Sequence, residues 1–281
     1  MRLARLAICV TLGICLPANA HCSLALAADA GVESAAESSA AGAGGTPADS
    51  ARSAFDIGQK ALRAKDYAAA YLSLRNAAEL GNAQAQTALG GMYLAGLGVG
   101  ANDAEALGWF RKAAEQGDAD AQVNLGLMYA NGQGVARDDE AAVKWFRLAA
   151  DMEDPAAQTN LGVMYLEGRG VEKDEAAAAN LLRMAALHGE PQAQFNLGIM
   201  FLEGRGVEQS DAEAAQWFSR AAEYGNALAQ YYLGVSYAEG RGVDRDDEQA
   251  HKWLTQAALQ GLSLANDYLR AKASIGAKSG N

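Results

Sequence analysis

One eleven-residue phrase recurs along the chain at a fixed interval. It reads LGVMYLEGRGV from Leu161 to Val171, and four further copies begin at Leu89, Leu125, Leu197 and Leu233. Successive copies start 36 residues apart, with no insertion or deletion between them. Because a period between about 20 and 50 residues is typical of solenoids and related arrays, this register predicts one array of stacked units.

Each unit is predicted to contain two helices. In the first, Leu125 and Tyr129 lie four residues apart on one face, and Gly126 permits close approach of a neighbouring helix. A Gly-x-Gly turn follows, whose glycines predict positive φ angles. The second helix is predicted to start at a good N-cap residue in every unit. These residues are Asn102, Asp138, Asp174, Ser210 and Asp246.

The second helix and the joint after it also follow a pattern. A pair of large apolar residues is followed by two alanines, as in Trp145-Phe146 and Ala149-Ala150. Large residues fill the layer between units, and alanines allow the next helix to come close. A glycine ends most units, but Glu153 takes its place in one of them, which predicts a different joint there.

The register also predicts the ends of the array. Residues 52–82 form a divergent first repeat, and residues 83–262 form five 36-residue units. Residues 263–273 repeat only the opening half of a unit and are predicted to be a capping helix, followed by a loose tail at 274–281.

The N-terminal segment has the pattern of a secretory signal peptide. Residues 1–28 combine Arg2 and Arg5 with an apolar run over 6–16 and two small-x-small sites, at 18–20 and 25–27. The alternative is a membrane helix that stays in place, but the run is short for a bilayer. Residues 29–51 are rich in Ala, Ser and Gly and are predicted to be a flexible leader.

Composition bears on the class of partner and on catalysis. The net charge is −11 without a Lys/Arg cluster, which argues against nucleic acid and anionic lipid as partners. No membrane insertion is expected after signal cleavage. All three cysteines lie within the first 22 residues, and no two histidines have metal-ligand spacing. We expect no metal and no cofactor. Acidic pairs such as Asp138-Asp139 suit helix starts, so the sequence does not predict an enzyme.

These motifs resemble the Sel1-like repeat family. The family pattern, A-x-A-Q-x-N-L-G-x-M-Y-x-x-G-x-G-V followed by A-x-x-W-F-x-x-A-A, is fullest at 119–134 with 142–150, and the resemblance covers about residues 52–272. It implies an all-α fold, a right-handed α-solenoid of antiparallel helix pairs similar to tetratricopeptide proteins. Many members are exported bacterial adaptors, periplasmic regulators or host-contact proteins. A cysteine-rich branch is linked to penicillin binding, and this chain lacks those cysteines.

The resemblance also implies a binding groove, because the first helix of each pair lines the concave face in tetratricopeptide stacks. The groove-facing positions would be the residue before the Asn of the N-L-G motif and the residue two positions after the Leu of that motif. They are Val123, Leu127, Thr159, Val163, Phe195, Ile199, Tyr231 and Val235. If exposed, they form an apolar strip for a helix or extended peptide; the alternative is that tight packing buries it.

A column of amides is the second candidate site. It consists of Asn124, Asn160 and Asn196. These side chains either make hydrogen bonds between neighbouring helices or form a ladder that holds a partner's backbone.

Together these features predict an exported, non-enzymatic adaptor or regulator that binds a partner protein on the concave face. The periplasm is the predicted location. The alternatives are a secreted host-contact factor and a cell-wall glycan or β-lactam binder. The sequence predicts neither the partner's identity nor an oligomeric state.

Overall fold

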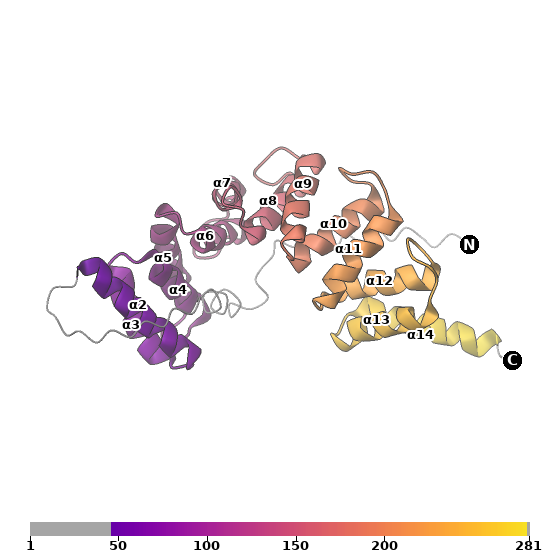
Figure 1. Ribbon diagram of the computed structural model, residues 1–281, viewed down its shortest axis with the longest axis horizontal. Coiled ribbons are helices and arrows are strands. Elements are labelled where there is room, and N and C mark those ends of the chain that lie inside the picture. Colours follow the sequence, from indigo (N-terminus) through magenta and orange to yellow (C-terminus); the bar gives the residue numbers. More distant parts are fainter. Residues whose placement is uncertain (1–45, 280–281) are drawn as a thin grey trace. The chain divides into compact units, whose positions relative to one another are not determined.

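The computed structural model describes residues 46–279, and side chains as far as residue 272. The predicted signal peptide at 1–28 and most of the predicted leader lie outside the described residues. The described residues form thirteen helices and no strand, so the all-α prediction is confirmed (Figure 1). They divide into two compact units, 46–153 and 154–279.

The N-terminal unit contains three helix pairs. Its helices are α2 (Pro47–Arg63), α3 (Tyr67–Glu79), α4 (Ala83–Ala95), α5 (Asp103–Glu115), α6 (Ala119–Asn131) and α7 (Asp139–Ala150). Each helix packs on the one before it and the one after it within the unit. We call the first helix of each pair the A helix and the second the B helix.

The C-terminal unit contains three further pairs and a final single helix. Its helices are α8 (Pro155–Glu167), α9 (Glu175–Leu187), α10 (Pro191–Glu203), α11 (Asp211–Glu223), α12 (Ala227–Glu239), α13 (Asp247–Leu259) and α14 (Ser263–Ser279). Here too, successive helices pack on one another, and α14 packs on α13 in the position of a further A helix. The predicted antiparallel pairs are visible in both units (Figure 1).

The Gly-x-Gly turns have the predicted backbone conformation and a second role that the sequence does not reveal. Gly204 ends α10 with φ 68°, and its N–H donates to the Met200 carbonyl. Gly206, with φ 64°, lies against the preceding B helix, where an added Cβ would overlap the carbonyl oxygen of Glu175. Gly98, Gly134 and Gly242 are placed in the same way. The turns therefore join successive units as well as ending helices.

Side-chain hydrogen bonds cap the start of the B helices and also join A helices to the B helices that precede them. All five predicted N-cap residues of the B helices accept hydrogen bonds from backbone N–H groups, which confirms them. A buried glutamine column is an additional feature of the A helices. The Nε2 atoms of Gln86, Gln122, Gln194 and Gln230 donate to carbonyls of the preceding B helix over 3.0–3.2 Å. The same carbonyls accept N–H groups from the glycines that follow the B helices, so each glutamine adds a second hydrogen bond at a helix end.

Both predicted ends of the array were wrong by several residues. Helix α2 begins at Pro47, five residues before the predicted start, because Thr46 and Asp49 form a capping box. Helix α14 continues to Ser279, so residues 274–279 are helical rather than a loose tail. Its glycine, Gly276, lowers helix stability by only about 1 kcal/mol, too little to end a helix.

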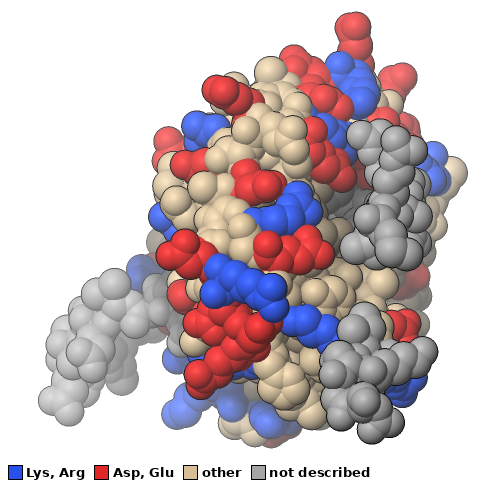
Figure 2. Space-filling model, turned by 90° about the vertical axis from the view of Figure 1, so that its right-hand side faces the viewer, with Lys and Arg blue, Asp and Glu red and all other residues tan. Residues whose placement is uncertain are grey.

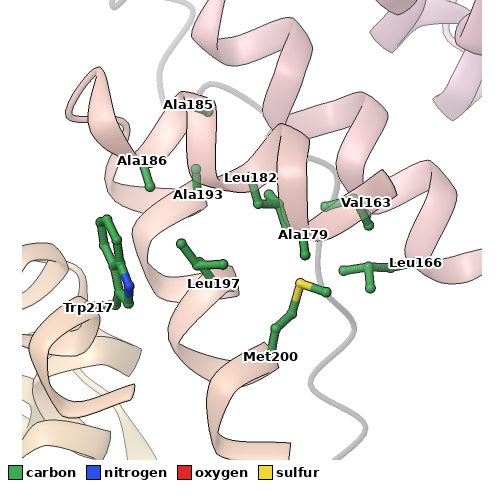
Figure 3. Packing of buried hydrophobic residues seen from close by; sticks show 11 residues of the cluster. Val163, Leu166, Ala179, Leu182, Ala185, Ala186, Ala193, Leu197, Met200 and Trp217 are labelled. Carbon is green, nitrogen blue, oxygen red and sulfur yellow. The ribbon is translucent and has the colours of Figure 1, made fainter. Parts of the chain in front are cut away.

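The core of the C-terminal unit forms where the B helix α9 meets the A helices α8 and α10. In Figure 3, Leu182 of α9 points toward Val163 of α8, while Leu197 and Met200 of α10 close the same cluster. The alanines of α9 leave room for this approach. Fully burying a leucine or valine contributes about 1.5–3 kcal/mol, so these contacts hold neighbouring pairs together.

The joint at Glu153 uses the same backbone conformation as its glycine counterparts. Glu153 has φ 63°, whereas Gly117 and Gly189 at the equivalent positions both have φ 89°. A residue with a Cβ is held here in the left-handed region, which costs about 1 kcal/mol.

We therefore expect Glu153→Gly to raise the free energy of unfolding by about 1 kcal/mol, because glycine adopts this φ without strain. Urea denaturation followed by circular dichroism measures it. Glu153→Ala is the control, since it removes the same carboxylate but keeps the Cβ. Equal stability of the two variants would show that the strain is absent.

Candidate functional site

Six of the eight predicted groove residues lie inside the protein. The buried six are Val123, Leu127, Thr159, Val163, Phe195 and Ile199, each with 8% exposure or less. Tyr231 and Val235 of α12 are partly exposed. The prediction of a continuous exposed strip is wrong for the buried six, and the alternative of tight packing holds for them.

Within the C-terminal unit, the buried positions Val163, Phe195 and Ile199 face the next helix pair rather than open solvent. Phe195 and Ile199 of α10 belong to one cluster with Leu233 of α12. The Phe195 ring lies 5.9 Å from the ring of Tyr232, measured between centroids. Val163 of α8 clusters in the same way with residues of α10. These A-helix positions therefore join successive pairs.

The asparagine column is held mainly by bonds within each helix. The Asn124 Nδ2 donates to the Asp120 carbonyl over 2.8 Å, and the Asn160 Nδ2 donates to the Ala156 carbonyl over 3.0 Å. Asn196 accepts a hydrogen bond of 3.0 Å from Gln192, one turn earlier in the same helix. These bonds do not join neighbouring helices. Asn160 and Asn196 are also buried, so they do not present an exposed amide ladder.

An aromatic surface remains partly exposed at the C-terminal end of the predicted strip. Tyr231 of α12 meets Tyr268 of α14 edge to face, with ring centroids 6.4 Å apart. Tyr232 stacks on the buried Phe218 at 5.2 Å and fixes the inner side of this group. We call Tyr231, Val235 and Tyr268 the tyrosine face. The sequence column pointed to Tyr231 and Val235 but did not include Tyr268.

Charges of both signs act on the tyrosine face, since Glu239, Asp247, Lys272 and Arg245 all influence Tyr268. Partial burial is the main cause that raises the pKa of Tyr231, Tyr232 and Tyr268 above the usual phenol value. The negative charge of Glu239 raises the pKa of Tyr231 and Tyr268 further, and that of Glu203 acts on Tyr232. All three phenols are therefore neutral at physiological pH and can donate hydrogen bonds.

Charged residues of the C-terminal unit form a periodic network. Arg205 Nε donates to Glu175 Oε1 over 3.1 Å, and an Arg241 Nη donates to Asp211 Oδ1 over 3.2 Å. Each bond reaches back from a Gly-x-Gly turn to the preceding B helix. On the face drawn in Figure 2, acidic and basic side chains lie interleaved rather than in a patch of one sign.

The described residues do not assemble a metal centre. Within residues 46–279, no group of three His, Cys, Asp or Glu side chains is placed to hold a metal ion. Burial raises the pKa of Asp154 and Glu190. Asp154 accepts a hydrogen bond from the N–H of Ala157, which makes it the N-cap of α8. In the same part of the chain, no helix is both long and apolar enough to cross a bilayer.

Successive helix pairs that pack on one another define an α-solenoid repeat protein. The Sel1 repeat model matches residues 83–118, 119–154, 155–190, 191–226 and 227–262. The chain therefore belongs to the Sel1 repeat family. Sel1 repeat proteins mediate protein–protein interactions, and their fold is a non-enzymatic scaffold. Comparison with curated proteins finds no match.

Solved structures of related proteins agree with this assignment. The protective antigen c5321 of uropathogenic Escherichia coli strains is 38% identical, with a TM-score of 0.71 over 76% of this chain. The match spans only 47% of c5321, so this chain is similar to about half of that protein. A Sel1 repeat protein from Oxalobacter formigenes is 36% identical over 75% of this chain and 84% of its own, with a TM-score of 0.70.

A more distant structure shares the fold alone. The immunity protein Pa5087 from Pseudomonas aeruginosa is 19% identical, with a TM-score of 0.50 over 77% of this chain and 83% of its own.

Proposed function

We propose that this protein is an exported, non-enzymatic adaptor that binds a segment of a partner protein at the tyrosine face. The observation that carries the proposal is the edge-to-face pair of Tyr231 and Tyr268, which stays partly exposed while the positions equivalent to Tyr231 in α6, α8 and α10 are buried. The bound segment would lie across α12 and α14.

Tyrosine suits such a role for physical reasons. An aromatic ring buries a large area on binding, and its hydroxyl supplies a hydrogen bond in the same contact. Tyrosine also loses little conformational freedom because it has two side-chain torsions, and it is enriched among residues that dominate interface energies. Stacking on Phe218 holds Tyr232 in place, so the face is ordered before a partner binds.

Export is supported by residues 1–28, whose charge, apolar run and small-residue sites have the form of a signal peptide. The similarity to half of a protective antigen is compatible with a protein outside the cytoplasm. We place the protein in the periplasm, with secretion toward a host cell as the second location. Fractionation of the producing cell into periplasm and culture medium separates the two.

Site-specific photo-crosslinking in the full chain tests the binding face. A photoreactive phenylalanine analogue at Val235 is expected to capture a partner in an envelope extract, and Tyr231→Ser is expected to abolish that capture. Losing one anchoring tyrosine costs about 2 kcal/mol, or roughly thirtyfold in affinity. The control places the analogue at Tyr224, which is 67% exposed at the end of α11.

The test compares the amount of partner captured from Val235 with the amount captured from Tyr224. Capture from Val235 that disappears with Tyr231→Ser supports the proposed face. Equal capture from Val235 and Tyr224, or capture that Tyr231→Ser leaves unchanged, would contradict it. Circular dichroism of each variant checks that the helices remain folded. Phe195, which is fully buried, is unsuitable for such a test because a polar residue there would disrupt the core.

A further inference from the structure

One arginine recurs in the B helices at the 36-residue interval. The column consists of Arg75 in α3, Arg111 in α5, Arg147 in α7 and Arg183 in α9. All four side chains are exposed. Because these arginines occupy equivalent positions, the surroundings of one can be compared directly with those of another.

The first two arginines of the column have partners within the protein. Arg75 pairs with Glu79, four residues later in the same helix, over 2.8 Å. Arg111 donates to the hydroxyl of Tyr129, in the next A helix, over 2.9 Å. An arginine at this position can therefore bind a carboxylate on its own helix or a hydroxyl on the next one.

Arg183 lacks both kinds of partner because two sequence changes coincide in its unit. The residue four positions later is Leu187, and Phe201 stands at the position equivalent to Tyr129. The Arg183 guanidinium lies 5.8 Å from the centroid of the Phe201 ring, at the outer limit of a cation–π contact. Arg183 forms no ion pair with any described residue. Its N–H donors therefore remain available to an acceptor from another molecule.

The helix surface around Arg183 is apolar. Leu187 lies one turn further along the same face of α9 and is 69% exposed. Met184, three residues before Leu187, is 45% exposed, and Phe201 of α10 is partly exposed. We call Arg183, Met184, Leu187 and Phe201 the α9 patch. Adjacent exposed apolar side chains around an unpaired arginine are typical of an interaction surface.

We propose that the α9 patch binds a segment of a partner protein in which one carboxylate stands beside large apolar residues. The carboxylate would take the place that Glu79 holds beside Arg75, since arginine binds a carboxylate through its planar fork. The apolar residues would cover Leu187 and Met184. The patch offers one unpaired arginine, and the net charge of −11 disfavours a segment with many negative charges. This surface uses other helices than the tyrosine face.

A peptide library tests the inference on the full chain. Random 12-residue peptides displayed on phage are selected against the wild-type protein and, separately, against Leu187→Glu. The substitution supplies a carboxylate four residues after Arg183, as Glu79 does for Arg75, so it pairs the arginine internally. Peptides enriched on the wild type over this variant are expected to contain one aspartate or glutamate beside leucine, isoleucine or phenylalanine.

A matched variant separates this site from a general effect of added negative charge. Leu259→Glu introduces the same charge at the equivalent position of α13, where Leu259 is 82% exposed. Binding of the most enriched peptide is measured by fluorescence anisotropy. Leu187→Glu and Arg183→Gln are each expected to weaken it at least tenfold, and Leu259→Glu less than twofold.

The peptide itself supplies a further comparison. Replacing its carboxylate by an amide is expected to weaken binding to the wild type at least tenfold, and circular dichroism checks that each protein variant remains helical. Enriched peptides without an acidic residue, equal weakening by Leu187→Glu and Leu259→Glu, or no enrichment on the wild type over Leu187→Glu would overturn the inference.

Discussion

Gly206→Ala is expected to lower the free energy of unfolding by about 3–4 kcal/mol. Two effects add at this position. Gly206 has φ 64°, a backbone conformation that residues with a Cβ adopt at a cost of about 1–2 kcal/mol. Its added Cβ would also overlap the carbonyl oxygen of Glu175, which belongs to the preceding B helix. A backbone atom cannot move aside as a side chain can, so the two helix pairs must separate.

Gly189→Ala is the matched control for this prediction. Gly189 has φ 89°, and an added Cβ would meet no atom within 4 Å. Only the conformational cost remains there, about 1–2 kcal/mol. Urea denaturation of both variants measures the difference, and hydrogen exchange locates the region that opens. If the two variants lose the same stability, the close approach of the turn to Glu175 does not hold the pairs together.

The 36-residue register was sufficient to predict the fold because it constrains every unit in the same way. Turn glycines, N-cap residues and alanine pairs recur at fixed positions. A unit that departs from the pattern at one position can therefore be assigned from the other four. The ends of the array have no such support. The capping box of Thr46 and Asp49 lies outside the repeat, within the segment whose composition predicts a flexible leader.

The candidate site was less predictable because the repeat pattern alone does not distinguish a groove from an interface between units. Phe195 and Tyr231 occupy equivalent positions, 36 residues apart, yet Phe195 is fully buried and Tyr231 is partly exposed. Their neighbours differ, because Phe195 lies against Phe218 and Tyr232, whereas Tyr231 meets Tyr232 and Tyr268 edge to face. Function in this chain is therefore expected where the periodic contacts run out, and that location requires the packed structure.

Gly198→Ala is the second substitution with a large expected effect, a loss of about 2–3 kcal/mol. An added Cβ would stand 2.6 Å from an edge carbon of the Phe218 ring. That ring is 1% exposed and is held between Phe195 and Tyr232, with centroids 6.0 and 5.2 Å away. Because the ring cannot move without displacing both neighbours, overpacking is expected to outweigh the gain in helix propensity, about 1 kcal/mol.

Gly162→Ala, at the equivalent position of α8, is expected to change stability by less than about 1 kcal/mol. Its nearest neighbour is the Cγ of Leu182 at 3.0 Å, in a cluster whose other α9 members are alanines. A leucine among small residues can shift by the few tenths of an ångström required, and the gain in helix propensity then offsets the strain. Thermal unfolding of the two variants tests this contrast, and equal losses would show that the partner side chain does not determine the cost. The cost of a methyl group at this helix position therefore depends on the B-helix side chain that lies opposite. At Gly198 that side chain is Phe218, whose ring also stacks on Tyr232 behind the tyrosine face.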